Sequence, residues 1–348
     1  MEFGFGLITC QRYPGDPRSD RDLYAEALAL AEEAERLGFD SVWVSEHHFV
    51  DDGYLPSLLP MCAAIAARTE RILIGTALVL APLHEPLRLA EDAAVVDLIA
   101  GGRLILGLGI GWREEEFDAL GVPLAQRGRR IRDAIAVLRQ AWSDGLVTGT
   151  AARPYPGVSV TPKPARPGGP PIWIGALAEP AIRRAGRIAD GFMATEVTPA
   201  SFAEQVAMAR EARERAGLDP ERFTVSLHLP TFAWEGEDAW ERVRDHHRHV
   251  AWKYDDMETA RGRTGPPPAP PPLVAEAEAD LRETIVVGTP ARVAERIDAF
   301  RRAAGGDLHY IARLYWPGMD PAVQREAMRV FAEEVIPLLG GSGAGDGA

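Results

Sequence analysis

The sequence predicts a single-domain (β/α)₈ (TIM) barrel, because short apolar runs alternate with segments of helical periodicity along nearly the whole chain. The 348 residues suffice for one large domain or two small ones. The strongest glycine-rich turn, residues 107–111, follows the fourth strand and not the first, which disfavours the alternative of a doubly wound sheet with an appended domain. We expect insertions after strands 4 and 7, with the barrel at residues 1–340 and a disordered tail at 341–348.

Four β/α units are expected in the first part of the chain. The segment Asp20–Gly38 illustrates the helical pattern, because its apolar residues recur on one face and a glycine ends it. The expected strands are Phe3–Thr9, Ser41–Ser45, Ile72–Leu80 and Arg103–Ile110, and the expected helices are Asp20–Gly38, Pro56–Arg68, Pro86–Ile99 and Arg127–Trp142.

The segment Val147–Gly169, rich in Pro, Gly and Thr, interrupts this rhythm as an excursion, since the alternation resumes directly after it. The proline-rich Gly265–Pro272 is expected to be extended and mobile. The remaining strands are expected at Ile172–Ala176, Gly191–Thr195, Phe223–Ala233 and Leu308–Trp316, and the remaining helices at Pro180–Ile188, Pro199–Ala216, Glu237–Glu258, Pro290–Ala304 and Pro321–Leu339.

Charge and composition narrow the function classes. With 38 Lys and Arg against 51 Asp and Glu, the net charge of −13 argues against nucleic-acid partners and against adhesion to anionic membranes. Cys10 and Cys62 are far apart in the sequence, which excludes a disulfide framework and a structural zinc site. No apolar run is long enough for a membrane span, and the start MEFGFGLITC has no signal-peptide pattern, so we expect a cytoplasmic protein.

Catalytic residues of such barrels lie at the carboxyl ends of the strands, which directs attention to Glu46, His47 and His48 after the second strand. Two histidines beside a carboxylate can transfer protons near neutral pH. The competing interpretation is a ring that only hydrogen-bonds to backbone at the rim. Metal ligation has little support, because adjacent residues diverge and no further His or Cys cluster is evident.

Three other strand ends could contact a ligand. The alternating glycines of residues 107–111 would let a flat ligand or a phosphate approach the backbone, although glycines also relieve crowding where a strand bends. The loop Gly175-Ala176-Leu177 precedes a helix whose free N–H groups suit phosphate, and one arginine of the Arg127–Arg130 cluster would add charge. Small residues from Thr76 and Ala77 onward leave room for a flat ring, or else belong to a tightly packed core.

The polar helix after the seventh strand carries His246, His247 and His249. His246 and His249 share a helical face, so a metal pair is conceivable, but a solvated surface is the favoured interpretation. The nearby Trp252 and Tyr254 would instead line the mouth of a substrate site.

Several of these motifs together resemble one family, the luciferase-like flavin-dependent oxidoreductases, which include the bacterial luciferase α subunit. The resemblance extends from about Met1 to Leu339. It is carried by MEFGFGLIT at the start, GFDSVWVSEHHF at 38–49, GTALVLAPLHEPLRLAEDAAVVDLIAGGRLILGLGIGW at 75–112, PPIWIGALAEPAIRRAGRIADG at 170–191 and VVGTPARVAERI at 286–297. The family fold is a (β/α)₈ barrel, in agreement with the alternation.

The resemblance implies that reduced flavin binds at the carboxyl-terminal mouth. His47 would be the acid–base residue beside the flavin. His48, next to it in the sequence, is a candidate of our own for contact with the substrate. The cofactor would be contacted near its ring by Glu46, Thr76 and Ala77, along its edge by Gly109, Ile110 and Gly111, and at its phosphate by Arg127, Gly175, Ala176 and Leu177. The Gly265–Pro272 segment falls where the luciferase branch has a mobile loop that shields the flavin intermediate.

Two departures from the luciferase pattern predict weaker binding of the FMN phosphate. The branch has an arginine where this chain has Ile110, and hydroxyl side chains where it has Ala176 and Leu177. They leave room for the deazaflavin coenzyme F420 as the alternative cofactor.

The resemblance therefore implies a monooxygenase that takes reduced FMN from a separate flavin reductase. It would use O₂, through a flavin C4a-peroxide, on a small organic substrate. A homodimer is expected by family. The alternatives are an F420-dependent reductase or dehydrogenase that transfers hydride, and a flavin-binding protein without turnover. The substrate pocket would be shaped by the insertions at about 147–169 and 235–280, which identify no substrate.

Overall fold

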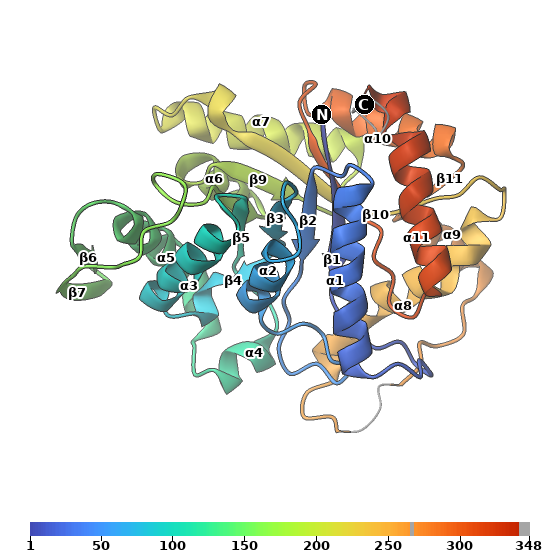
Figure 1. The fold of residues 1–348 in the computed structure, drawn as a ribbon, viewed down its shortest axis with the longest axis horizontal. Helices are drawn as coiled ribbons and strands as arrows, with labels where there is room; N and C mark the ends of the chain where they lie inside the picture. The colour runs from blue at the N-terminus through green and yellow to red at the C-terminus, as the bar shows by residue number, and fades with distance from the viewer. Residues whose placement is uncertain (265–267, 341–348) are drawn as a thin grey trace.

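Eight parallel strands form a closed barrel, which confirms the predicted (β/α)₈ fold (Figure 1). The computed structural model describes residues 1–264 and 268–340. Neighbouring strands pair in the order β1, β2, β3, β5, β8, β9, β10 and β12, and β12 pairs with β1 to close the ring. The barrel strands are β1 (Glu2–Ile8), β2 (Ser41–Val44), β3 (Leu73–Thr76), β5 (Leu104–Gly109), β8 (Ile172–Gly175), β9 (Gly191–Ala194), β10 (Thr224–Ala233) and β12 (His309–Arg313).

The helices surround the strands, and most begin within a few residues of the predicted positions. Helix α1 shows why the sequence determines such boundaries: Ser19 and Asp22 form a reciprocal capping box at its start, and its buried face is apolar. The α-helices are α1 (Asp20–Arg36), α2 (Leu58–Ala66), α3 (Pro86–Ile99), α4 (Glu114–Ala119), α5 (Arg127–Trp142), α6 (Glu179–Ile188), α7 (Pro199–Arg215), α8 (Ala239–Thr259), α9 (Ala275–Glu283), α10 (Pro290–Ala303) and α11 (Pro321–Val330).

The structure corrects several expected elements. The strand expected at Ile72–Leu80 is interrupted at residues 77 and 78, and its end forms a separate short strand, β4 (Val79–Leu80). The final helix passes after α11 into a π-helical turn at Phe331–Val335. Helices α4 and α9 and strand β11 (Val286–Gly288), which pairs with the end of β10, were not expected.

The two expected insertions are present. After α5 the chain forms an antiparallel hairpin of β6 (Val147–Thr150) and β7 (Arg153–Val158), which stands beside the barrel in Figure 1. After β10 come α8, α9 and β11. Of the proline-rich Gly265–Pro272, residues 265–267 lie outside the described residues, as does the tail expected at 341–348, and residues 268–272 form neither helix nor strand.

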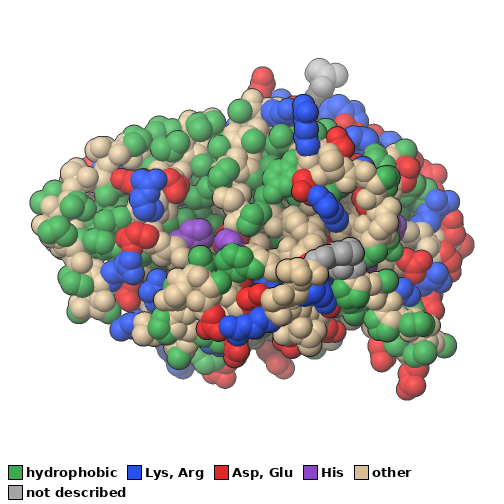
Figure 2. Space-filling view, turned by 90° about the horizontal axis from the view of Figure 1, so that it is seen from below, with side chains coloured by type: hydrophobic (Ala, Val, Ile, Leu, Met, Phe, Trp, Pro, Cys, Tyr) green, Lys and Arg blue, Asp and Glu red, His purple; other side chains and the backbone are tan. Residues whose placement is uncertain are grey.

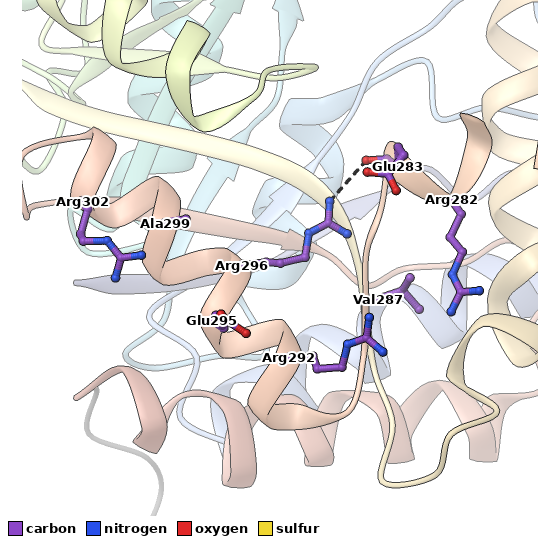
Figure 3. Close-up of a pocket in the computed structure, with 8 residues that line it drawn as sticks. All are labelled: Arg282, Glu283, Val287, Arg292, Glu295, Arg296, Ala299 and Arg302. Atoms are coloured by element: carbon purple, nitrogen blue, oxygen red, sulfur yellow. Dashed lines mark hydrogen bonds between the residues drawn. The ribbon is translucent and has the colours of Figure 1, made fainter. Parts of the chain in front are cut away.

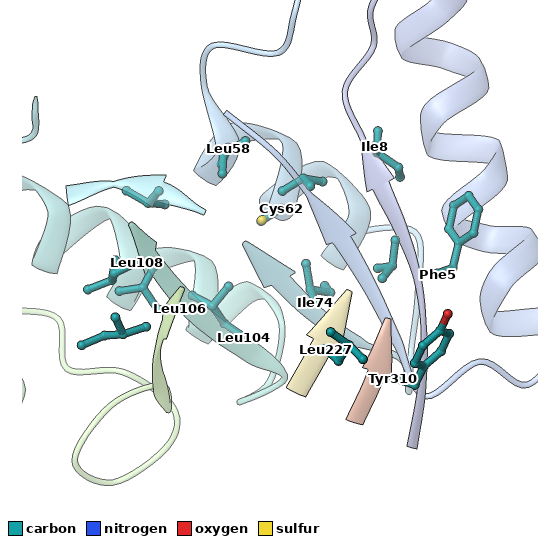
Figure 4. Packing of buried hydrophobic residues seen from close by; sticks show 14 of the residues in the cluster. Phe5, Ile8, Leu58, Cys62, Ile74, Leu104, Leu106, Leu108, Leu227 and Tyr310 are labelled. Carbon is teal, nitrogen blue, oxygen red and sulfur yellow. The ribbon is translucent and has the colours of Figure 1, made fainter. Parts of the chain in front are cut away.

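Outward-facing side chains of the strands build the main core against the helices. Phe5 and Ile8 of β1 and Ile74 of β3 belong to this layer, together with Leu58 and Cys62 of α2 (Figure 4). Burial of apolar surface at about 25 cal/mol per Å² makes this layer the principal source of stability.

Inside the barrel, Trp43 and Trp173 stack with ring centroids 5.1 Å apart. Glycines on neighbouring strands make room for them: a Cβ at Gly75 would lie 2.2 Å from Trp43, and one at Gly191 would lie 2.6 Å from Trp173. The interior is therefore a packed core and not a channel. Within the described residues, none of the helices combines the length and the apolar composition that crossing a membrane requires.

Candidate active site at the carboxyl ends of the strands

The candidate site lies where the loops after β2 and β5 meet helix α8. This end of the barrel is at the bottom of Figure 1, and Figure 2 shows it face-on. Histidine side chains are visible near the middle of that face, among hydrophobic side chains and with acidic and basic side chains around them. The position agrees with the rule that barrel enzymes build their sites from the loops after the strands.

His47 is held by a carboxylate that the sequence analysis did not single out, Glu116 of α4. The Nδ1 atom of His47 lies 2.9 Å from Oε1 of Glu116, and the same oxygen accepts the backbone N–H of His48 at 2.9 Å. Both side chains are nearly inaccessible, with 7% and 0% of their surface exposed. Because the carboxylate accepts hydrogen bonds, Nδ1 of His47 carries the hydrogen, which leaves Nε2 to exchange a proton with a bound molecule.

Glu46 and His48 form a second pair, with His48 Nε2 2.8 Å from Glu46 Oε1. His84, also missed by the sequence analysis, contacts the same oxygen at 3.2 Å. Burial opposes the charge on Glu46, but the two histidines outweigh it and lower the pKa of the carboxyl. Burial also opposes protonation of His48, but the hydrogen bond to Glu46 and the nearby negative charges raise its pKa. The Glu46 charge is thus balanced by its own histidines.

Aromatic rings enclose His47. Tyr54 lies edge-on to it with ring centroids 4.9 Å apart, Tyr254 of α8 at 5.7 Å and Trp112 at 5.8 Å. The two tyrosine hydroxyls are 3.2 Å apart, and Tyr54 also donates to Ser45 at 2.9 Å. Tyr254 therefore lies beside His47, whereas Trp252, expected at the same mouth, packs against His249 with ring centroids 5.9 Å apart.

Two sets of polar contacts fasten α8 over this end. Arg113, at the start of α4, donates to the carbonyls of His48 at 2.6 Å and of Met257 at 3.1 Å. Lys253, fully buried, contacts Asp51 at 2.5 Å and Asp256 at 2.9 Å.

Arg263 completes the second set by pairing with the same two carboxylates as Lys253. Burial opposes the charge on Asp51 and Asp256, but the two cations lower the pKa of both. The loop that follows His48 is thereby tied to the end of α8.

Glycines of the two turns pack against one side chain, that of Leu78. The side chain of Leu78, in the interruption between β3 and β4, fills the space over them: a Cβ at Gly109 would lie 3.1 Å from Leu78 and one at Gly175 only 2.1 Å. These glycines make room for Leu78, as crowding relief would require. Thr76 is buried and donates its hydroxyl to the Gly107 carbonyl at 2.8 Å, and Ala77 is also buried.

The residues expected to hold a phosphate lie between α5 and α6. Arg127 begins α5 and donates to the Leu124 carbonyl at 3.2 Å. Within the described chain, no hydrogen bond joins Arg127 to the 175–177 loop. In that loop the Ala176 N–H bonds to Met193, and the Leu177 side chain is exposed. Ile110 is half-buried, and Gly111 packs against Phe117 in a left-handed conformation.

An unexpected cation lies next to this region. Arg184 of α6 approaches Gly128, where a Cβ would lie 3.3 Å from its guanidinium, and its Nη1 is buried without a hydrogen-bond partner among the described residues. Helix α6 has no side-chain cap at Ala178, but Pro180 carries no N–H group and the N–H groups of the next two residues bond to the Ala178 carbonyl, so this helix start offers few free N–H groups. The guanidinium of Arg184 is therefore the feature of this region that suits a phosphate.

The favoured interpretation of the α8 histidines was wrong, because these side chains are not solvated. His247 and His249 are buried, and His246 bonds through Nδ1 to the Pro317 carbonyl at 3.0 Å. Burial lowers the pKa of His247 and of His249 to about 4, so both rings are neutral. Across the described residues, no three His, Cys, Asp or Glu side chains gather as metal ligands would.

A hollow of about 410 Å³ lies away from this site, against α9, β11 and α10 (Figure 3). It is lined by residues that were not predicted to be functional: Arg282, Glu283, Val287, Arg292, Glu295, Arg296, Ala299 and Arg302. Figure 3 shows that its charged side chains come from α9 and α10, which do not carry His47 or its partners.

The structure thus brings together His47, Glu46, His48 and Tyr254, which the sequence analysis singled out, with Glu116 and Tyr54, which it did not. The signal for Glu116 was available, since three consecutive glutamates begin a helix directly after the glycine-rich turn. Only the fold shows which of the three is buried.

Comparison with known proteins gives a consistent family. The family model of luciferase-like monooxygenases matches residues 1–308. An F420-dependent glucose-6-phosphate dehydrogenase from Microbacterium testaceum is 32% identical over 348 residues, which covers 90% of this chain and 93% of the relative. Among solved structures, the monooxygenase RslO1 from Streptomyces bottropensis has a TM-score of 0.79 and 25% identity, covering 97% of this chain and 99% of its own.

A monooxygenase relative matches over a shorter region. The oxygenase component of flavin-dependent trigonelline monooxygenase from Acinetobacter baylyi is 29% identical over 174 residues, covering 49% of this chain and 48% of the relative. The match thus spans about half the length of this relative, and the same holds for an uncharacterised relative of which 53% is covered.

Proposed function

Because this chain belongs to the luciferase-like monooxygenase family, we propose that it is a flavin-dependent monooxygenase that uses reduced FMN and O₂ on a small organic substrate. The observation that carries the proposal is the His47–Glu116 pair, whose Nδ1–Oε1 distance is 2.9 Å, enclosed by three aromatic rings at the mouth of the barrel. The monooxygenase relatives from Acinetobacter and Streptomyces support the reaction type.

Residues on two sides of the mouth would hold the cofactor. Ala77 and Leu78 would offer an apolar edge for a flat ring, beside Gly109, Ile110 and Gly111, with the buried Thr76 behind them. Arg184 of α6, whose Nη1 has no hydrogen-bond partner among the described residues, would hold a phosphate together with the 175–177 loop that precedes α6. Arg127 is next in the sequence to Gly128, which the Arg184 guanidinium approaches. Reduced flavin bound there would supply the electrons that activate O₂.

His47 would move the proton that this chemistry requires. The hydrogen bond from Nδ1 to Glu116 fixes the tautomer and stabilises the ring when Nε2 gains a proton. Nε2 would then give a proton to, or take one from, the reacting molecule. Tyr54 stays protonated, because burial raises its pKa well above the usual value of 10, and it keeps the hydrogen that it donates to Ser45.

The contacts that fasten α8 over the mouth would exclude water during this step. Arg113 bonds to carbonyls on both sides of the mouth, and buried Lys253 joins the β2 loop to α8. A site sealed in this way protects a reactive species from solvent and strengthens the electrostatic interactions inside it.

A separate flavin reductase would deliver the reduced flavin. The Acinetobacter relative is an oxygenase component, which supports a division of labour between two proteins.

A second candidate is an F420-dependent dehydrogenase or reductase, in which His47 would exchange a proton with the substrate while hydride is transferred. Similarity to the Microbacterium enzyme over 90% of this chain favours it, as does the aliphatic Ile110 in the glycine-rich turn.

Anaerobic titration with reduced FMN, and in parallel with reduced F420, tests the two candidates. The proposal predicts that reduced FMN binds more tightly, and that O₂ then oxidises the complex with formation of an oxygenated product. His47→Asn should keep cofactor binding but lose most of the turnover. Preference for F420 together with turnover that needs no O₂ would establish the second candidate and refute the monooxygenase.

A further inference from the structure

Arg313 is a cation at the end of β12, close to the candidate site. It is the last residue of β12 and is half-buried, and β12 places it beside Gly6 of β1 and Pro230 of β10. Within residues 1–264 and 268–340, its guanidinium makes no hydrogen bond and no ion pair. A chain with 51 acidic residues against 38 basic ones would easily supply a carboxylate for a structural arginine.

Other charged groups at this end of the barrel are already paired. Glu116 bonds to His47, and Glu46 bonds to His48 and His84. Asp51 and Asp256 share Lys253 and Arg263, as described above. Arg113, another arginine of the mouth, bonds to backbone carbonyls and to Glu115. Among the described residues, Arg313 therefore stands out as a cation of this site that no carboxylate pairs with.

The surroundings of Arg313 suit an organic anion. Its guanidinium carbon lies 5.9 Å from the centroid of the Tyr254 ring, whose other neighbours are His47 and the hydroxyl of Tyr54. Pro230 of β10 pairs with Arg313, and His228 lies two positions before Pro230. His228 therefore lies on the same face of the sheet as Arg313. Its Nδ1 is buried and has no hydrogen-bond partner among the described residues.

The ring of His228 adds a polar group without adding charge. Burial, together with the positive charge of Arg313, lowers the pKa of His228 to about 3, so the ring is neutral at physiological pH. A neutral imidazole can donate or accept one hydrogen bond beside a bound anion without repelling it.

We propose that Arg313 binds a negatively charged group of the substrate, a carboxylate or a phosphate, so that this enzyme acts on organic anions. The inference rests on the proposed function and extends it to the substrate class. A guanidinium can hold either group through two parallel hydrogen bonds, which fixes orientation as well as adding affinity.

The position of Arg313 in the barrel assigns this anion to the substrate and not to the cofactor phosphate. In the order of strands β12 and β5 are four steps apart in either direction, which places them on opposite sides of the eight-stranded ring. The residues that suit the cofactor phosphate follow β5 and β8. His47 follows β2, midway between β5 and β12, so a substrate anchored at Arg313 would extend past Tyr254 towards His47.

Paired ligands that differ only in charge test the inference on the cofactor-loaded protein. The probes are acetate with acetamide and benzoate with benzamide, together with inorganic phosphate, and dissociation constants come from isothermal titration calorimetry. We expect the wild type to bind at least one anion tenfold or more tightly than its amide, or to bind phosphate. Arg313→Gln should lose this preference, and Arg313→Lys should keep part of it. The matched control is Arg292→Gln in the hollow beside α10, which should leave the preference unchanged.

Three results would overturn the inference. The wild type could bind anions and amides equally and fail to bind phosphate, or Arg313→Gln could retain the preference for the anion. Arg313→Gln could also weaken cofactor binding tenfold while remaining as heat-stable as the control, which would make Arg313 a cofactor ligand. Failure of the proposed function is a separate observation, namely that the wild type binds neither cofactor, or prefers reduced F420 and turns over without O₂. It is measured before any anion is added.

Discussion

Replacing Gly175 with alanine tests whether the glycines at the mouth accommodate Leu78 or a ligand. The new Cβ would lie 2.1 Å from Cδ1 of Leu78, which is also packed against Gly109, where a Cβ would lie 3.1 Å away. The Leu78 side chain must therefore move by about an ångström, and overpacking of this kind typically costs about 1–3 kcal/mol. The φ angle of Gly175 is not positive, so the backbone itself tolerates alanine.

Thermal unfolding measures this cost. With an unfolding entropy of about 2.1 cal/mol/K per residue, 348 residues convert it into a fall in Tm of about 1–4 °C. In a protein that already carries Leu78→Ala, the Gly175→Ala substitution should no longer lower Tm, because the added methyl enters the space that Leu78 vacated. The coupling energy between the two substitutions should therefore reach about 1–3 kcal/mol. Gly145→Ala is the matched control: nothing lies within 4 Å of its Cβ position, so its Tm should stay constant or rise slightly.

The opposite pattern would refute this assignment. If the backbone of Gly175 is kept bare for a ligand, Gly175→Ala would leave Tm unchanged but weaken the binding of reduced FMN or F420, with no rescue by Leu78→Ala. Tm and cofactor affinity are both measured on the wild type, the two single variants and the double variant. Direct comparison of these proteins separates the two explanations.

Three further predictions concern the polar groups of the site. Glu116→Gln removes the negative charge from a hydrogen bond worth about 1.5–3 kcal/mol, so the single-turnover rate should fall roughly 10- to 150-fold with cofactor affinity unchanged; an unchanged rate would show that Glu116 does not assist His47. The Glu46–His48 pair makes its full contribution to stability between about pH 4.5 and pH 6.5, which are the ordinary pKa values of a glutamate and a histidine. Its contribution is lost above this range as pH rises through the raised pKa of His48, and below it as pH falls through the lowered pKa of Glu46. The Tm difference between wild type and His48→Gln should therefore be largest between these values and shrink at pH 8, and a difference that grows with pH would contradict the assignment. Lys253→Met should lower Tm by about 4 °C, since removing one partner of a buried ion pair costs about 3 kcal/mol, and an unchanged Tm would show that the network contributes nothing.

Local patterns in the sequence were sufficient for the architecture. The periodicity of Arg127–Trp142 and Pro86–Ile99 predicted both helices to the residue, because a buried apolar face and a terminating signal are properties of neighbouring residues. The strand expected at Ile72–Leu80 was only partly correct, since the interruption at residues 77 and 78 depends on how Leu78 packs across to β5 and β8. The histidines of α8 were placed wrongly at a solvated surface, because α9 and the loop after β12 cover them.

The sequence by itself determined the barrel, the family and the location of His47 at a strand end, since each follows from short-range periodicity and contiguous motifs. The tertiary structure decided which groups act on one another. Glu116 reaches His47 across 69 positions of the chain, and Tyr254 meets Tyr54 across 200. Arg313 resembles any other arginine of the sequence until β12 places it beside Tyr254 without a carboxylate within the described residues. Such pairings arise because closing the barrel brings the ends of distant strands to one rim, and local sequence carries no record of that distance.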